Sequence, residues 1–146
     1  QYRELRVRAE TVAIDDLLPL PKVLERFKLF RVHQLAALRN AHRIPESARG
    51  VGSPWPITPP VVERLADGRL VVIDGAHRAY AARARGDVRM EAIVVDNPWF
   101  NLPATPLSGW DEIRIESRKL PREQRYKDFQ SSEYRPIRAA LRTLAG

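Results

Sequence analysis

The chain has 146 residues, of which 44% are hydrophobic, and a formal net charge of +7. This length suits one domain with a sizeable core and excludes two full domains with separate cores. The absence of cysteine excludes disulfides, thiolate chemistry and cysteine zinc sites. No apolar run approaches the roughly 20 residues of a membrane span, and the first residues lack the apolar core of a secretory signal. We therefore expect a cytoplasmic protein with no membrane partner, and the positive charge favours an anionic ligand.

The first part of the chain predicts a strand, a connection, a helical segment and a loop. Residues 5–12 alternate apolar and polar side chains, as a half-buried strand does. An apolar connection punctuated by proline follows over 17–21. Residues 22–43 have helical apolar spacing and a basic polar face, which indicates one interrupted helix or two consecutive helices. Turn-forming residues dominate 44–60 and predict a loop.

The middle of the chain predicts two strands joined by a tight turn, then a helix and a third strand. In order, these are a strand at 55–65, a turn at 67–68, a strand at 69–73, a helix at 76–85 and a strand at 90–95. The Asp-Gly pair is a strong hairpin signal. Gly86 is placed to end the helix, because glycine adopts the left-handed conformation of a helix C-terminus without strain.

The character of the chain changes after Asp96. We expect a core over 1–96, and over 97–146 a proline-rich connection followed by helices packed on that core. Charged residues beyond Trp110 predict helix, and the apolar spacing from Ile137 to Leu144 predicts a C-terminal helix. The fold class is therefore α/β of the α+β kind, with a C-terminal helical extension.

The segment Asp74-Gly75-Ala76-His77-Arg78 joins a strand to a helix and is the candidate site. Glycine lets the backbone turn sharply and lets a ligand approach the amides. The helix offers unpaired N–H groups and the positive end of its dipole. Arg78 can hold two phosphate oxygens, His77 can add a donor, and Asp74 can hold Mg²⁺ or accept a proton. This corner therefore predicts an anion site, for which phosphate is the natural occupant.

Each charged residue of the corner also has a purely structural explanation. Asp74 can cap the helix, and Arg78 can pair with Asp74 four residues earlier. The strand–corner–helix context favours the anion site, because it directs the amides, the imidazole and the guanidinium at one point.

The order of elements, together with the Asp-Gly-x-His-Arg-x-x-Ala-Ala motif, resembles the ParB N-terminal and sulfiredoxin superfamily over about residues 5–95. The resemblance implies a compact domain with a small mixed sheet flanked by helices, in which the corner cradles nucleotide phosphates. Carried onto this sequence, it makes Gly75, His77 and Arg78 phosphate contacts. It also implies contacts from Arg31 and Gln34 in the basic helical segment.

Ala76 separates the chain from two branches of this superfamily. Sulfiredoxins place their catalytic cysteine at that position, so sulfinic-acid reduction is excluded. The chromosome-segregation proteins carry Gly-Glu-Arg-Arg there and need a sizeable helix-turn-helix domain, for which residues 110–146 are too short. The corner most resembles that of the free-serine kinases, which read Asp-Gly-His-His-Arg or similar. Those kinases also use a glutamate just after the first strand, where this chain has no carboxylate and Glu25 is the nearest acid.

These observations predict a ParB-like protein that binds ATP, ADP or CTP with Mg²⁺. It would transfer phosphate to a small hydroxyl-bearing substrate, or hydrolyse the nucleotide. The predicted catalytic residues are Asp74 and His77, the predicted metal ligand is Asp74, and the predicted nucleotide contacts are Gly75, His77, Arg78, Arg31 and Gln34. The alternatives are a DNA-associated binding module and a catalytically silent nucleotide sensor. The oligomeric state stays open.

Overall fold

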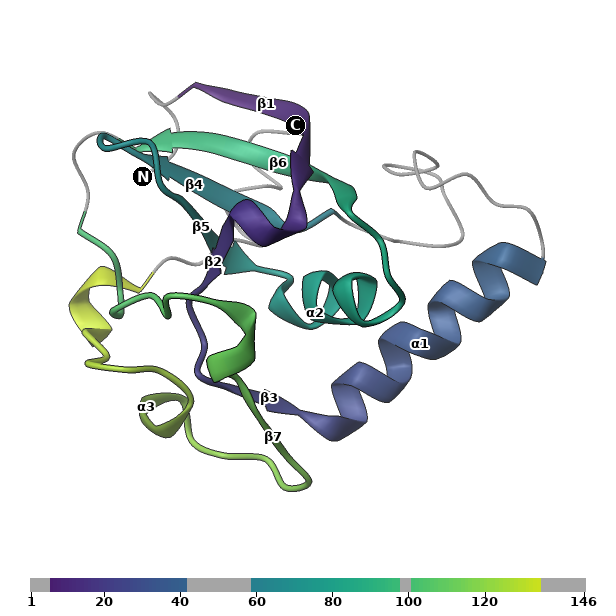
Figure 1. Ribbon diagram of the computed structural model, residues 1–146. Helices are drawn as coiled ribbons and strands as arrows, with labels where there is room; N and C mark the ends of the chain where they lie inside the picture. The colour runs from purple at the N-terminus through teal and green to yellow at the C-terminus, as the bar shows by residue number, and fades with distance from the viewer. Residues whose placement is uncertain (1–5, 42–58, 98–100, 135–146) are drawn as a thin grey trace, which may run out of the picture.

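The structure, a computed structural model, describes residues 6–41, 59–97 and 101–134, with no side chains described over 35–41. These residues form a five-stranded mixed sheet, a two-stranded sheet and three α-helices (Figure 1). The strands are β1 (Val7–Ala13), β2 (Leu17–Pro19), β3 (Val23–Glu25), β4 (Val61–Leu65), β5 (Leu70–Asp74), β6 (Arg89–Asn97) and β7 (Arg114–Glu116). The helices are α1 (Arg26–Ala41), α2 (Ala76–Ala84) and α3 (Arg122–Arg125). The predicted α+β class is confirmed.

The large sheet has the strand order β1-β6-β4-β5-β2. Its outer strand β1 is antiparallel to β6, β6 is parallel to β4, and β2 is parallel to β5. The antiparallel β4–β5 pair is the predicted hairpin, and Gly68 in its turn has a φ of 90°. In Figure 1, α2 lies below this sheet and α1 lies beyond α2. None of the described helices is long and apolar enough to cross a membrane.

Two short strands replace parts of the expected connection and helix. Residues 17–19 form β2 because Leu17 and Pro19 are buried where the chain runs parallel to β5. The helical segment begins at Arg26, later than the expected residue 22, because Val23 and Leu24 are buried in β3. In both places the backbone hydrogen bonds of the short strand are made with a strand that is distant in the sequence. The local apolar pattern contains no information about that partner.

The expected helix beyond Trp110 is wrong for residues 113–121 and 126–130. Residues 114–116 form β7, which pairs in parallel with β3. Pro121, which lacks a backbone N–H, directly precedes the short helix α3. The start of the expected strand at 55–58 and the expected C-terminal helix at 137–144 lie outside the described residues.

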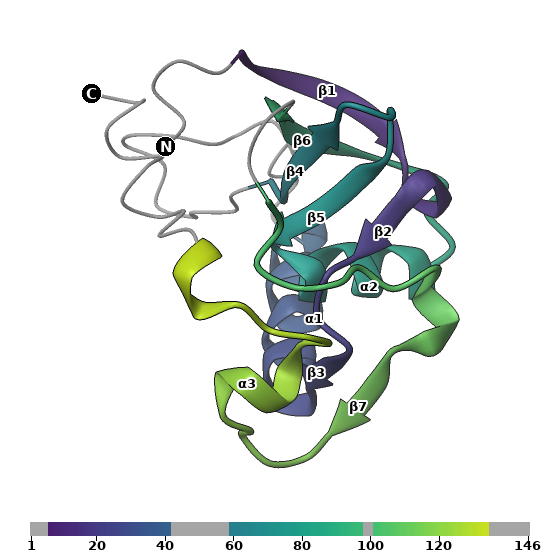
Figure 2. The same ribbon diagram turned by 90° about the vertical axis from the view of Figure 1, so that its left-hand side faces the viewer.

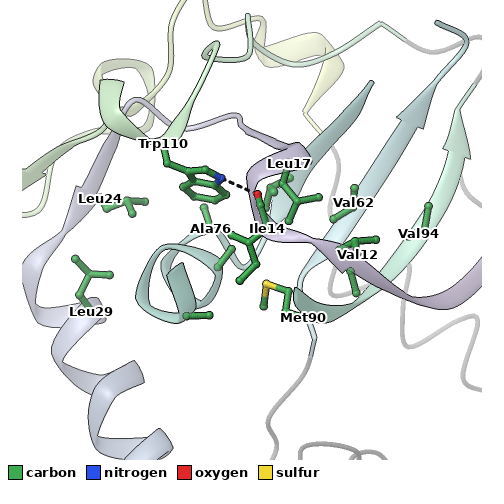
Figure 3. Packing of buried hydrophobic residues seen from close by; sticks show 14 residues of the cluster. Val12, Ile14, Leu17, Leu24, Leu29, Val62, Ala76, Met90, Val94 and Trp110 are labelled. Atoms are coloured by element: carbon green, nitrogen blue, oxygen red, sulfur yellow. Dashed lines mark hydrogen bonds between the residues drawn. The ribbon is translucent and has the colours of Figure 1, made fainter. Parts of the chain in front are cut away.

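Trp110 ties the later part of the chain to the core. Its side chain is buried in the main hydrophobic cluster, which includes the alanine face of α2. The indole Nε1–H donates a hydrogen bond of 3.0 Å to the carbonyl of Ile14 (Figure 3), and the ring lies tilted against Tyr80. The donor of a buried tryptophan needs such a partner, so this contact fixes where residues 110–116 run.

Two glycines with positive φ stand at the two ends of the corner helix α2. Gly86 follows the helix with a φ of 91°, and the next N–H, of Asp87, donates to Ala82 across 3.0 Å. This is the predicted glycine cap. Gly75 precedes the helix with a φ of 86°, and a Cβ there would lie 2.8 Å from the Cα of Pro60. Gly75 is therefore required both by its conformation and by the close approach of the Pro60 backbone.

Replacing each glycine by alanine separates these two requirements. Gly86→Ala has open space around its Cβ, so we expect it to lower the free energy of unfolding by about 1–2 kcal/mol, the cost of the left-handed conformation. Gly75→Ala adds a clash with backbone, so we expect a loss of about 3 kcal/mol. Chemical denaturation of both variants measures the difference. Equal losses would show that the approach of Pro60 contributes nothing.

Candidate functional site

The candidate site begins at the N-terminus of α2. Gly75 is the N-cap residue, and no described side chain makes a capping hydrogen bond there. The structural explanation of Asp74 as the helix cap is therefore wrong. The guanidinium of Arg78 folds back over this end of the helix, since its Nη2 lies 2.9 Å from where a Gly75 Cβ would be. The N-terminal end of the helix dipole and a guanidinium thus meet at Gly75, an arrangement suited to an anion.

His77, in the first turn of α2, is hydrogen-bonded to the last residue of β3, directly before α1. Its Nε2 accepts a hydrogen bond of 3.0 Å from the backbone N–H of Glu25. Burial, followed by the positive charge of Lys28, lowers the pKa of His77 from 6.5 to about 4. The ring is therefore neutral at pH 7, with its proton on Nδ1. In this form His77 can donate one hydrogen bond through Nδ1.

The carboxylate of Glu25 is fully buried, and one of its oxygens forms ion pairs with two cations. Its Oε1 lies 3.1 Å from Lys28 Nζ and 3.2 Å from Arg125 Nη1. Its Oε2 and the Nε of Arg125 are also buried, and neither has a hydrogen-bond partner in the described structure. Lys28, Arg125 and Arg78 lower the pKa of His77 through their charges, behind burial, while the charge of Glu25 opposes them and raises it. Charged groups from three parts of the chain therefore act on this imidazole.

Arg125 reaches the site because its segment runs beside the residues before β3. The N–H of Lys22 donates to the carbonyl of Arg125 across 2.8 Å, and Pro21 and Tyr126 form a β-bridge. On the other side, the N–H of Arg114 donates to the carbonyl of Lys22 across 3.0 Å. Figure 2 shows α3 and β7 next to β3. The later part of the chain therefore supplies a wall of the site.

Tyr126 connects this wall to the Asp74 end of the corner. Burial raises the pKa of Tyr126; Arg125 opposes this shift through its charge, while the Asp74 carboxylate adds a smaller upward contribution. Asp74 therefore lies within electrostatic reach of Tyr126, and both residues are half-buried.

The other two predicted contacts lie on the solvent-exposed side of α1. Arg31 and Gln34 are both exposed, and the Arg31 guanidinium lies 5.7 Å from the centre of the Phe27 ring. Asp74, Gly75, His77 and Arg78 are grouped at the corner. The nucleotide contacts expected from Arg31 and Gln34 stay predictions.

Sequence reasoning did not identify most of the charged residues around His77. The sequence offers Glu25 only as the nearest acid after the first strand, and it assigns no role to Lys28, Arg125 or Tyr126. A charged residue after the apolar pair Val23-Leu24 is a weak signal for Glu25. Arg125 has no local signal, because α3 has an ordinary charged composition.

Comparisons with known proteins reveal similarity to a few solved structures. No family model and no curated protein matches the chain. Two structures of the pNOB8-like ParB N-domain align with 65% and 66% of this chain, at 21% and 19% identity and TM-scores of 0.34 and 0.35. The chain covers 31% and 30% of those two chains, less than a third of their length. Protein Atu1540 from Agrobacterium tumefaciens aligns with 95% of this chain, at 16% identity and a TM-score of 0.42. The alignment covers 69% of the length of Atu1540. At this level of similarity, function has to be argued from the residues of this chain.

The lowered pKa of His77 predicts a loss of stability in acid. Above about pH 6.5 the ring is neutral in both the folded and the unfolded chain, and its contribution is constant. Between about pH 6.5 and 4 the unfolded chain binds a proton that the folded protein excludes, so stability falls as the pH falls. We expect a loss on the order of 3 kcal/mol across this window, measured by denaturant unfolding at several pH values.

The matched variants are His77→Gln and His33→Gln. His77→Gln keeps an acceptor but cannot be protonated, so we expect a flatter pH dependence between pH 4 and 6.5. His33 is exposed on α1, and its replacement is expected to leave the slope as in the wild type. An unchanged slope in His77→Gln would contradict the assignment.

Proposed function

We propose that this chain is a ParB-like nucleotide-binding protein that holds the phosphates of ATP, ADP or CTP at the Asp74–Arg78 corner. The observation that carries the proposal is the Gly75 corner itself. There, a helix N-terminus without a side-chain cap meets the guanidinium of Arg78. Backbone N–H groups and a guanidinium fork are the usual donors to phosphate oxygens.

The proposed reaction is phosphate transfer to a small hydroxyl-bearing substrate, or hydrolysis of the nucleotide. Positioning and charge neutralisation would supply most of the catalysis. In this proposal Asp74 accepts the proton of the attacking hydroxyl, and neutral His77 donates a hydrogen bond to a phosphate oxygen. Arg31 and Gln34 would contact the part of the nucleotide that extends along α1.

In the alternative role of Asp74, its carboxylate holds Mg²⁺ together with the phosphates instead of accepting the proton. The described residues contain no group of three histidine, aspartate or glutamate side chains that could hold a metal alone. Mg²⁺ commonly takes one or two carboxylates, substrate phosphates and waters, so a single carboxylate beside a phosphate site fits it. When bound, the ion would neutralise charge on the phosphates.

The direct test is calorimetric titration of the protein with ATP, ADP and CTP in the presence of Mg²⁺. We expect saturable binding, weakened in Arg78→Ala by about 2 kcal/mol, or roughly thirtyfold, because the charged hydrogen bonds to phosphate are lost. The control is Arg85→Ala at the other end of α2, where the guanidinium pairs with Asp87 at 2.8 Å. Absence of nucleotide binding by the wild type would end this proposal. Binding without turnover over a panel of hydroxyl compounds would identify a silent sensor.

Nucleic acid is the second candidate partner, and α1 favours it. The first nine residues of this helix contain no acid, and Phe30 among them is 62% exposed beside exposed Arg26 and Arg31. Aromatic and basic side chains together suit a single strand, through base stacking and phosphate contacts.

A gel shift at two salt concentrations tests this partner, with and without nucleotide. We expect retardation that weakens steeply at the higher salt concentration, because binding releases counterions. Phe30→Ala should reduce it, while Val88→Ala, at an exposed site outside α1, should not. No retardation at low salt would remove nucleic acid as a partner.

A further inference from the structure

Glu25, which is buried, pairs with Arg125, which is partly exposed, in a way that the corner alone does not explain. Glu25 places one oxygen between Lys28 and Arg125, while its second oxygen and the Nε of Arg125 are buried without hydrogen-bond partners among the described residues. A fully buried carboxylate that uses only one of its oxygens is poorly satisfied. The two cations are partly open to solvent, with side-chain exposures of 38% for Lys28 and 20% for Arg125.

We propose that Lys28 and Arg125 form a second anionic subsite, next to the Gly75 corner, that Glu25 occupies until a phosphate replaces it. The ligand class is a diphosphate or triphosphate, with one phosphate at Gly75 and Arg78 and another at Lys28 and Arg125. This inference rests on the proposed function and specifies which nucleotides the site prefers.

The position of His77 connects the two subsites. It lies in the first turn of α2, between Gly75 and Arg78 on one side and the Glu25 backbone on the other. The charges of Lys28, Arg125 and Arg78 all lower the pKa of its imidazole, and the charge of Glu25 raises it. In this proposal a ligand with adjacent phosphates contacts both groups of cations, whereas a single phosphate occupies only one.

The charge balance explains why Glu25 can give way to a ligand. A phosphate offers Arg125 two oxygens in place of the single oxygen that Glu25 presents, and the planar fork of arginine is suited to two. The Nε of Arg125, now without a partner among the described residues, would gain an acceptor. Because Glu25 competes as an internal anion, neutralising it should strengthen phosphate binding.

The test compares the affinities of AMP, ADP and inorganic pyrophosphate by calorimetry in the presence of Mg²⁺. For the wild type we expect ADP to bind more tightly than AMP. Arg125→Ala should weaken ADP and pyrophosphate about tenfold and leave AMP nearly unchanged, because only the second phosphate loses a partner. Arg78→Ala should weaken all three ligands. Glu25→Gln should tighten ADP and pyrophosphate about tenfold, since the competing charge is removed.

The matched control is Arg122→Ala. Arg122 belongs to the same short helix, but its guanidinium lies 4.0 Å from the centre of the Tyr134 ring. It should leave every affinity unchanged. Lys28→Ala provides an independent arm and should lower the ADP to AMP ratio as Arg125→Ala does. Thermal unfolding shows whether each variant is folded. Because Arg125→Ala and Lys28→Ala test the subsite independently, the proposal stays testable even if Glu25→Gln does not fold.

The outcomes separate the subsite from the proposed function. If the wild type binds nucleotides, but Arg125→Ala and Lys28→Ala leave the ADP to AMP ratio unchanged, the subsite is wrong and nucleotide binding stands. If Glu25→Gln weakens pyrophosphate while remaining folded, Glu25 is not a competitor and the proposal is overturned. If pyrophosphate binds and no nucleotide does, the subsite stands and the nucleotide proposal fails. If neither pyrophosphate nor any nucleotide binds, both the subsite and the proposed function are rejected.

Discussion

The hydrogen bond from the Glu25 N–H to His77 Nε2 is the contact on which the site depends. It joins the residue before α1 to the first turn of α2, so it sets how the two helices start relative to each other. It also requires the acceptor form of the imidazole, which burial and nearby cations favour by lowering the pKa of His77. Protonation would turn Nε2 into a donor facing another donor, and would add a positive charge among three cations. The neutral ring is therefore a condition for the geometry.

Glu25 has a second role in the same place through its side chain. An isolated buried carboxylate is strongly unfavourable, and paired cations offset that cost. Here Lys28 and Arg125 both pair with Glu25, and the guanidinium of Arg78 lies at Gly75. These cations are the basis of the proposed anion site. The close approach of Pro60 to Gly75 holds the backbone side of the corner, so that the amides and the charged side chains keep their relative positions.

Three separate parts of the chain build this site. The strand-to-helix junction of β3 and α1 supplies Glu25 and Lys28, the junction of β5 and α2 supplies the corner, and α3 supplies Arg125. The third part is held by pairing of β7 with β3 and by the burial of Trp110 (Figures 2 and 3). Residues 101–134 are therefore part of the structure that shapes the site, and changes in them are expected to alter it even where they lie outside the motif.

The sequence by itself determined the features that depend on neighbouring residues. Alternation of side chains identified β1, the Asp67-Gly68 pair identified the hairpin, and Gly86 identified the end of α2, because each is set by local backbone preferences. The same holds for the corner, where Gly75, His77 and Arg78 are nearly adjacent in the chain. Tertiary structure decided the short strands β2, β3 and β7, whose backbone needs a distant partner, and it decided the pairing of Arg125 with Glu25 across 100 positions. No local pattern encodes that contact, since it arises only when β3 and α3 lie side by side.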